Sequence, residues 1–383
     1  MRSTRLVPAA SAVLIASAAV LALAPAASSR PLPQAPDCPV FPAASPWNQR
    51  VDRLPVASGS KAFIAASRIT RLHPDFSDSD ADGYGIPFTV VDAGTPPAAV
   101  RFEYADESDP GPYRIPDGAP VEGGGDRHVL VVDRSACTLS ELFAAERTAQ
   151  RTWRAGSGAR WDLRSTRLRP AGWTSADAAG LPILPGLARH DEVAAGIGGI
   201  DHALRITVPT TQRAYLWPAR HFASSVRTPS AVPMGLRLRV RATFDTRRFG
   251  PQIRAILEAG KRYGFIVADN GSAGFISGAP DPGWNDDDLH DLHRVPASAL
   301  EVVDTSSLPG TPSAPRAWNI RWTTVAGTRR ATMLLSRSAR VTVTARVGGK
   351  VVARKQVRAK QGFVGIGIAV RRGATYHLSF ARS

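Results

Sequence analysis

Acidic residues stop at Asp304, and this break constrains the fold of the chain more than any other feature of its sequence. Fifteen of the 48 Lys and Arg residues lie after Asp304, where no Asp or Glu follows. Between residues 27 and 304, 31 cations accompany 32 acids, so that stretch has a net charge of −1. We therefore expect two units, a nearly neutral body and a basic C-terminal module.

The basic module predicts an anionic partner. A surface of one sign attracts polyanions by electrostatic steering and by release of their counterions. Outside a cell the abundant polyanions are anionic wall polymers, lipopolysaccharide and acidic polysaccharides, so we expect these rather than nucleic acid. Coding bias is the alternative explanation, because 43 of the 48 cations are Arg, but bias does not explain the missing acids.

A Pro-rich stretch separates the two expected units. Residues 305–317 contain Pro309, Pro312 and Pro315 without hydrophobic periodicity, which is typical of a linker. Beyond it, short alternating runs predict a small basic β-sandwich over residues 318–383. The runs are 318–325, 331–335, 341–347, 351–357, 363–370 and 376–380. A module of this kind holds a secreted body at a surface, or it only caps the body and stabilises it.

The N-terminus has the features of a signal peptide. Arg2 and Arg5 precede an apolar run over 6–23, and Ala24-Pro25-Ala26 fits a cleavage site, so residues 1–26 are the predicted signal. No later window has about eighteen consecutive apolar residues, so we expect no membrane span. These features predict a secreted protein, extracellular or associated with the cell wall.

Two cysteines, Cys38 and Cys137, remain in the exported chain. In an oxidising compartment an even number of cysteines is usually bridged, so we predict a disulfide between them. Two buried free thiols are the alternative.

The body, residues 27–304, has a mainly β pattern. Its strand candidates are separated by Gly/Pro-rich loops, which favours a β-sandwich or a jelly-roll-like fold. One amphipathic helix is expected over about 251–262, after Pro251 at its first turn. Asn270-Gly271 predicts a hairpin between 265–268 and 275–277, in which Asp269-Asn270 is read as turn chemistry. The other strand candidates are 88–91, 100–104, 128–133, 200–208, 213–217 and 236–244.

Three carboxylates two residues apart, Asp78, Asp80 and Asp82, stand before Gly83. This spacing resembles the first half of a calcium loop, in which alternate oxygens converge on a hard cation. The twelfth position is Thr89 rather than a bidentate Glu. The two interpretations are therefore a Ca²⁺ site and a solvated acidic loop; no other cofactor is expected.

A second tract, between Trp153 and His221, combines carboxylates, histidines, arginines and aromatic rings. A sugar site needs such a set, because acid/base chemistry uses a pair of carboxyl groups and aromatic rings pack on apolar sugar faces. The candidate catalytic residues are Asp162, Glu192, Asp201 and His221. The candidate substrate-binding residues are Trp161, Arg205, Tyr215, Trp217 and Arg220. His202 lies between Ile200 and Leu204 on one face of its expected strand and is interpreted as a core histidine.

Three tracts resemble an uncharacterised family of secreted bacterial proteins. They are residues 172–182 (GWTSADAAGLP), 199–205 (GIDHALR) and 263–271 (YGFIVADNG), and the string at 41–48 is similar too. The resemblance covers most of 38–304 and none of the tail. It implies that the body is one unit, and it implies no activity.

Two functions fit these observations. The first is a secreted carbohydrate-active enzyme that cleaves a polysaccharide. A hydrolase would use two of Asp162, Glu192 and Asp201, with His221 assisting; a lyase would use His221 or Tyr215 as base, with Arg220 or Arg205 neutralising a uronate. The alternative is a non-catalytic cell-wall or glycan-binding protein. We expect a monomer in either case. No serine-hydrolase elbow, zinc-protease, P-loop or dinucleotide motif occurs in the sequence.

Overall fold

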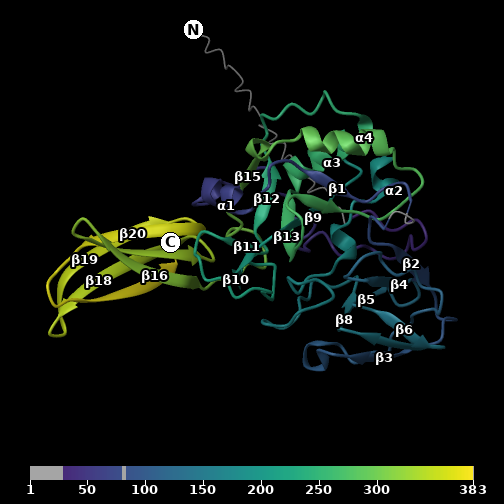
Figure 1. Cartoon of the computed structure of the whole chain (residues 1–383), viewed down its shortest axis with the longest axis horizontal. Coiled ribbons are helices and arrows are strands. Elements are labelled where there is room, and N and C mark those ends of the chain that lie inside the picture. The colour runs from purple at the N-terminus through teal and green to yellow at the C-terminus, as the bar shows by residue number, and fades with distance from the viewer. Residues whose placement is uncertain (1–28, 80–82, 383) are drawn as a thin grey trace, which may run out of the picture.

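The computed structural model describes residues 29–79 and 83–382, so the predicted signal peptide lies outside the described residues. The chain is mainly β, with several sheets and few helices, as the sequence predicts. Figure 1 shows a larger body and a C-terminal module that projects from one side of it. No helix in the described part of the chain has the length and apolarity that a membrane crossing requires.

A six-stranded mixed sheet forms the centre of the body. The predicted helix is confirmed as α3 (Pro251–Arg262), which begins with Pro251 and buries Ile253, Ile256 and Leu257. It packs on the strand that precedes it in the chain. The strand order is β1 (His73–Asp75), β14 (Phe275–Ser277), β9 (Leu204–Val208), β13 (Phe265–Asn270), β12 (Arg237–Val240) and β15 (Leu300–Val302).

The predicted hairpin after Asn270 is wrong. β13 and β14 do not pair, because β9 lies between them in the sheet. The connection crosses the end of β9, where the backbone N–H groups of Gly271 and Gly274 donate to the carbonyls of Val208 and Thr207. Gly274, with a φ of 80°, supplies the left-handed backbone that the return requires. Asn-Gly thus marks a crossover between non-adjacent strands.

β9 is also more buried than its sequence predicts. Alternation over 200–208 predicts a half-buried strand, yet every residue from Leu204 to Val208 is buried. The strand is covered on both faces, and its polar face, with Arg205 and Thr207, lies inside the body. Arg205 therefore needs internal partners.

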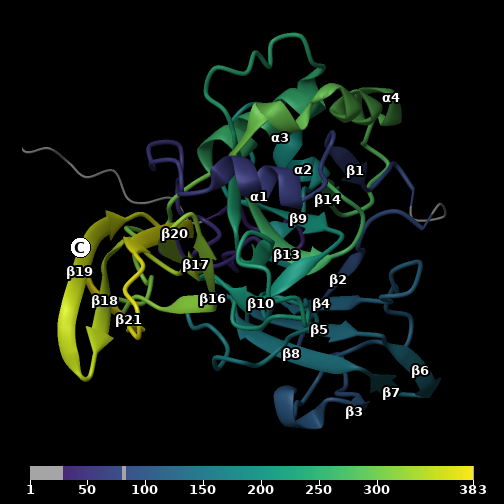
Figure 2. The same ribbon diagram turned by 60° about the vertical axis from the view of Figure 1, so that its left-hand side comes forward.

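Two smaller sheets form a second layer below the central sheet (Figure 2). The four-stranded sheet is buried on both sides: Val129 and Val131 share a core with Trp153 of the three-stranded sheet, while Leu130 and Val132 pack with the N-terminal segment. Its order is β2 (Phe88–Val91), β4 (Val129–Asp133), β5 (Thr138–Phe143) and β8 (Ser157–Asp162). The three-stranded sheet contains β3 (Ala99–Phe102), β7 (Thr152–Ala155) and β6 (Glu146–Ala149).

The remaining elements of the body are short. The strands β10 (Thr211–Tyr215) and β11 (Val232–Met234) form a parallel pair. The helix α1 (Ser60–Ala66) packs on β15, and α4 (Asp286–His290) packs on α3. The last of the short helices is α2 (His190–Val193).

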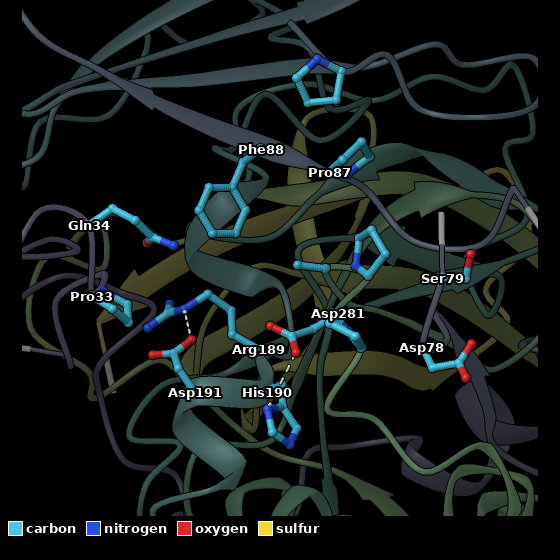
Figure 3. A pocket seen from close by; sticks show the side chains of 14 residues that line it. Pro33, Gln34, Asp78, Ser79, Pro87, Phe88, Arg189, His190, Asp191 and Asp281 are labelled. Carbon is cyan, nitrogen blue, oxygen red and sulfur yellow. Dashed lines mark hydrogen bonds and ion pairs between the residues drawn. The ribbon is translucent and has the colours of Figure 1, made fainter. Parts of the chain in front are cut away.

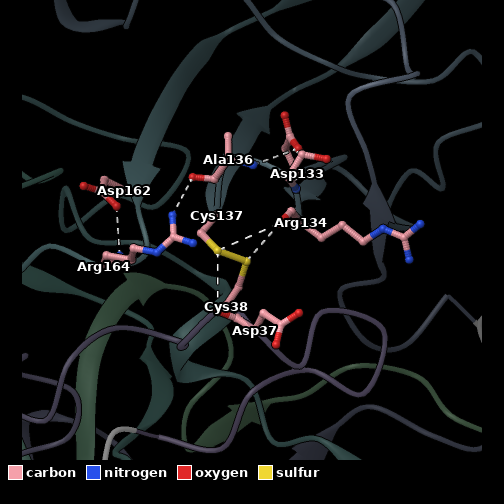
Figure 4. The surroundings of a disulfide bond; sticks show 9 residues. Asp37, Cys38, Asp133, Arg134, Ala136, Cys137, Asp162 and Arg164 are labelled. Atoms are coloured by element: carbon pink, nitrogen blue, oxygen red, sulfur yellow. Dashed lines mark hydrogen bonds between the residues drawn. A yellow bond between two sulfur atoms is a disulfide. The ribbon is translucent and has the colours of Figure 1, made fainter.

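The predicted disulfide between Cys38 and Cys137 is confirmed. Figure 4 shows it between the N-terminal segment and the turn that follows β4. Its two Cα atoms are 5.3 Å apart, and both side chains are buried. The bond fixes the N-terminal segment to the four-stranded sheet.

Replacing both Cys38 and Cys137 by Ala should lower the free energy of unfolding by about 2 to 4 kcal/mol, because the unfolded chain regains a loop of about a hundred residues. The two residues are 99 positions apart in the chain. Urea denaturation of the wild type with and without reductant, beside the double variant, measures the difference. If the double variant and the oxidised wild type unfold at the same urea concentration, the stabilising role is refuted.

The C-terminal module is a sandwich of two three-stranded sheets around its own apolar core. One sheet has the order β16 (Ala317–Val325), β17 (Thr328–Leu335), β20 (Gly362–Ala369). The other has the order β19 (Lys350–Ala359), β18 (Ala339–Val347), β21 (Thr375–Arg382).

The module is docked on the body by hydrogen bonds and apolar contacts. Ser58 exchanges backbone hydrogen bonds with Gln361 and Phe363, and Asp304 accepts from Ser338 at 2.6 Å. Leu334 belongs to the core of the body. The predicted linker, 305–317, is mostly exposed, but it touches the body at its first half: Thr305 is buried, and Gln49 donates to the carbonyl of Pro309.

Candidate functional site

Ionisable side chains gather where the central sheet meets the four-stranded sheet. We call them the junction cluster, and each either affects the pKa of another member through its charge or has its own pKa affected by one. Five are acids and two are cations, so the cluster has an excess of negative charge. Its members are Asp75, Glu122, Asp126, His128, Asp177, Arg205 and Asp269.

Arg205 of β9 is the buried centre of the junction cluster. Its Nη2 donates to Oδ1 of Asp177 at 2.9 Å and to Oδ2 of Asp269 at 2.8 Å. Its Nη1 donates to the hydroxyl of Ser277 at 2.7 Å, and β14 then pairs with β1 so that Ser277 lies opposite Asp75. Three neighbouring strands thus place Asp75, Ser277 and Arg205 in one row.

A β-bulge brings Asp269 to the same face. Along β13, Val267 pairs with Ile206, but Asp269 rather than Ala268 pairs with Thr207. One extra residue reverses which side chains point to which face of a strand. Asp269 therefore lies on the face of Arg205 and Thr207, and 17% of its side chain remains exposed.

His128 and Glu122 come from the loop that leads into β4. The Nδ1 atom of His128 is hydrogen bonded to Oε2 of Glu122, and its Nε2 lies 3.0 Å from the carbonyl oxygen of Ala176. A carboxylate and a carbonyl both accept, so the charged form of the ring can donate to both partners. Burial disfavours this charge, but the hydrogen bond and charge of Glu122 outweigh burial and raise the pKa of His128.

The environment moves the carboxyl pKa values in opposite directions. Burial raises the pKa of Asp75 and of Asp269, and it raises the pKa of Asp177 to about 8 in spite of Arg205. Burial also opposes ionisation of Glu122, but His128 overcomes it and lowers the pKa of Glu122. Neighbouring carboxyl groups whose pKa values move apart are candidates for acid and base chemistry.

Glu141 of β5 lies beneath the site and is fully buried. It accepts hydrogen bonds from the backbone N–H groups of Ile183 and Leu184, at 2.8 and 3.0 Å, and from Trp161 Nε1 at 3.2 Å. Burial raises its pKa to about 7. Glu141 thus joins the four-stranded sheet to the segment that carries Asp177.

Glu141→Gln should change how stability depends on pH. The folded chain keeps a proton on Glu141 up to about pH 7, whereas the unfolded chain loses it near 4.5, so this contribution is complete below about pH 4.5 and is lost as pH rises through 7. We expect the unfolding free energy of the wild type, relative to Glu141→Gln, to fall by about 3 kcal/mol from about pH 4 to about pH 8. Urea denaturation at each pH measures it, and a constant difference would contradict it.

The structure does not bring the predicted catalytic carboxylates together. Glu192 is fully buried in an ion pair with Arg189 and a contact with His202, so it cannot reach a substrate. His202 is thus a core histidine, as expected. Asp201 lies beside that pair and accepts from the backbone N–H of Arg30. Asp162 ends β8, where its carboxylate accepts from the backbone N–H of Arg164 (Figure 4).

The predicted aromatic binders are mostly core residues. The Trp161 and Trp217 rings are 4% and 8% exposed, which leaves little surface for a sugar. Tyr215 is half-buried. It packs against Phe222 of the body and against Trp318 of the C-terminal module.

Two other predicted residues, Arg220 and His221, lie next to the segment that carries Asp177. Nδ1 of His221 is 2.9 Å from the carbonyl oxygen of Ala178, and Nε of Arg220 donates to the carbonyl of Arg169. Of the four predicted catalytic and five predicted substrate-binding residues, only Arg205 belongs to the junction cluster.

The predicted calcium loop is only partly described. Asp78 is described, whereas Asp80 and Asp82 lie outside the described residues. Within 29–79 and 83–382, no group of three or more His, Cys, Asp or Glu side chains is arranged to hold a metal ion. The Ca²⁺ site stays a prediction.

No known protein-family model and no curated protein sequence matches the chain. The resemblance of three tracts to secreted bacterial proteins therefore stays a prediction. All three tracts contribute to the junction cluster, since they contain Asp177, Arg205 and Asp269 respectively.

Proposed function

We propose that the chain is a secreted carbohydrate-active enzyme that hydrolyses a glycosidic bond at the junction cluster. One observation carries the proposal: carboxyl groups from separate strands and loops converge, and their pKa values move in opposite directions. Glycosidases use such a pair, in which one protonated carboxyl group acts as acid and one charged carboxylate acts as base or nucleophile.

Asp75 is the proposed acid. Burial raises its pKa, the positive charge of Arg205 opposes this, and the negative charges of Glu122 and Asp126 raise it further. A raised pKa favours the protonated form of a carboxyl group, which is the form that protonates the leaving oxygen. Asp269 is a positioning residue instead, because its two oxygens already accept from Arg205 and from the backbone N–H of Asn270.

Glu122 is the proposed base or nucleophile. Its side chain is 15% exposed, and His128 keeps it charged and fixes its position. The separation of its carboxyl group from that of Asp75 in the substrate complex decides whether water enters between them, and so whether the anomeric configuration is inverted or retained.

Hydrolysis fits this site better than β-elimination. A lyase needs a free cation to neutralise a uronate, but Arg205 is occupied by Asp177, Asp269 and Ser277. His221 is not a member of the junction cluster: its Nδ1 is hydrogen bonded to the carbonyl oxygen of Ala178, which leaves Nε2 as the basic atom, but the ring stacks on Phe222 away from the clustered carboxyl groups.

Secretion and surface binding complete the proposal. The signal sequence over 1–26 and the disulfide both fit an oxidising compartment outside the cytoplasm. The C-terminal module would bind an anionic surface polymer: Arg340 of β18 lies directly opposite Arg358 of β19, a repulsive pair that a polyanion relieves.

Incubation of the secreted chain with a panel of plant, fungal and bacterial glycans tests the activity. We expect new reducing ends on at least one glycan. Unsaturated products would show that the enzyme breaks the bond by elimination rather than by hydrolysis. No product on any glycan, combined with retained binding to one of them, would support the alternative of a non-catalytic glycan-binding protein and refute the enzyme.

Retention on an immobilised anionic wall polymer tests the module. We expect elution by salt, and elution at lower salt for the Arg340→Ser, Arg358→Ser double variant, because fewer counterions are exchanged on binding. Arg154→Ser, at an exposed position in the body, is the matched control. If the double variant and the Arg154→Ser control elute at the same salt concentration, the polymer does not bind at Arg340 and Arg358.

A further inference from the structure

A pocket of about 490 Å³ lies beside the junction cluster and contains none of its residues. Figure 3 shows part of its lining, with Phe88 on one side and Arg189, His190 and Asp191 on another. The loops of the cluster also line it, since Asp78 follows Asp75 in the chain and Pro120 precedes Glu122. Its volume is in the range of small-ligand sites.

The pocket has rigid apolar walls. Phe88 and five prolines line it, and proline provides no backbone N–H and has a fixed φ. Directional contacts therefore come mainly from a few polar side chains, an arrangement typical of ligand sites. The prolines are Pro33, Pro87, Pro120, Pro280 and Pro282.

Two polar atoms in the wall of the pocket are buried without a partner. Arg189 is 1% exposed, and it donates from Nε to Asp191 at 3.1 Å and from Nη2 to Glu192 and to the carbonyl of Arg30. Its Nη1 has no hydrogen-bond partner, and neither has Oδ2 of Asp191. A buried polar atom without a partner is unfavourable, and a hydroxyl group bound in the pocket would supply the missing partner.

The charges of the lining select the class of ligand. Among the described residues of the lining, Asp78, Asp191 and Asp281 outnumber Arg189, the one Arg or Lys, so an anion is repelled. A free N–H beside a free carboxylate oxygen suits a ligand that both donates and accepts, as a hydroxyl group does. A sugar ring presents several hydroxyl groups at its edge and an apolar face for Phe88 and the prolines.

We propose that this pocket binds a neutral glycosyl unit of the substrate, with Arg189 and Asp191 bonded to its hydroxyl groups and Phe88 against its apolar face. The inference deepens the proposed function and rests on it for the nature of the substrate. The pocket would hold one sugar of a chain whose next linkages pass the junction cluster. Binding there is separate from cleavage.

Titration with neutral methyl hexosides, methyl glucosides, galactosides and mannosides, tests the pocket by calorimetry or by ligand-observed NMR. We expect at least one to bind, and Asp191→Ala and Phe88→Ala each to weaken binding at least about ten-fold. Asp287→Ala, at an exposed position outside the pocket, is the matched control and should bind as the wild type does. Thermal denaturation of each variant identifies any that fails to fold; Phe88→Ala tests the pocket without disturbing the Arg189 ion pairs.

Three results would overturn the inference: no methyl hexoside binds, glucuronate binds more tightly than every neutral hexoside, or both pocket variants bind as the wild type does. The proposed function fails separately. A chain that binds hexosides in this pocket but cleaves no glycan keeps the inference and loses the hydrolase. A chain that cleaves glycans, with pocket variants that bind unchanged, keeps the hydrolase and loses the inference.

Discussion

Arg205→Met should lower the free energy of unfolding by about 3 to 5 kcal/mol, because it leaves the buried carboxyl groups of Asp177 and Asp269 without their counterion and hydrogen-bond donor. Asp177 is fully buried, Asp269 nearly so, and both accept hydrogen bonds from Nη2 of Arg205. Methionine fills much of the same volume, so the loss reports on charge rather than on a cavity. Urea denaturation at neutral pH measures it.

The loss of unfolding free energy in Arg205→Met should depend on pH and on the presence of Asp177 and Asp269. Without Arg205, burial and neighbouring acids raise the pKa of Asp177 and of Asp269 further, against the opposing charge of His128. Both carboxyl groups therefore take up protons as pH falls, and the penalty at about pH 5 is smaller than at about pH 8. The triple variant with Asp177→Asn and Asp269→Asn should recover part of the stability. A loss below about 1 kcal/mol, or one independent of pH, would contradict the central place of Arg205.

Much of the fold follows from local patterns in the sequence. The acid-free tail, its six alternating runs, the helix over 251–262 and the Cys38–Cys137 bond all depend on periodicity, composition or residue type. Such signals are contained in the segment that they describe. The errors arise where a distant segment decides the outcome: β9 separates β13 from β14, and neighbouring layers cover the polar face of β9.

The site was harder to predict for the same reason. Asp75, Glu122, Asp177 and Asp269 are spread over most of the body, and strand pairing and a bulge bring them together. No spacing in the sequence predicts that these side chains lie close together. Arg205 was a candidate because its tract combines carboxylates, histidines, arginines and aromatic residues, but the sequence analysis assigned it to substrate rather than to buried carboxyl groups. A cation on a strand that turns out to be buried is the signal that could have pointed to the site.

Asp75→Asn and Glu122→Gln should each reduce kcat/KM on the glycan that the wild type cleaves by about a thousand-fold or more, which corresponds to about 4 kcal/mol of transition-state stabilisation. Neither amide can transfer the proton or carry the charge that its role requires. Both substitutions preserve the size of the side chain, so thermal denaturation should show folded variants. Asp287→Asn, outside the cluster, is the matched control.

The two roles differ in what restores the rate. A dinitrophenyl glycoside has a leaving group that departs without protonation, so Asp75→Asn should recover most of the wild-type rate for cleavage of that bond, whereas Glu122→Gln should not. The dependence on pH should separate them too. Because the environment lowers the pKa of Glu122 and raises that of Asp75, the wild type needs a charged Glu122 on the acidic side and a protonated Asp75 on the alkaline side. Asp75→Asn should therefore lose the alkaline limb. Equal losses on both substrates, with unchanged limbs, would mean that these two carboxyl groups do not act as acid and base.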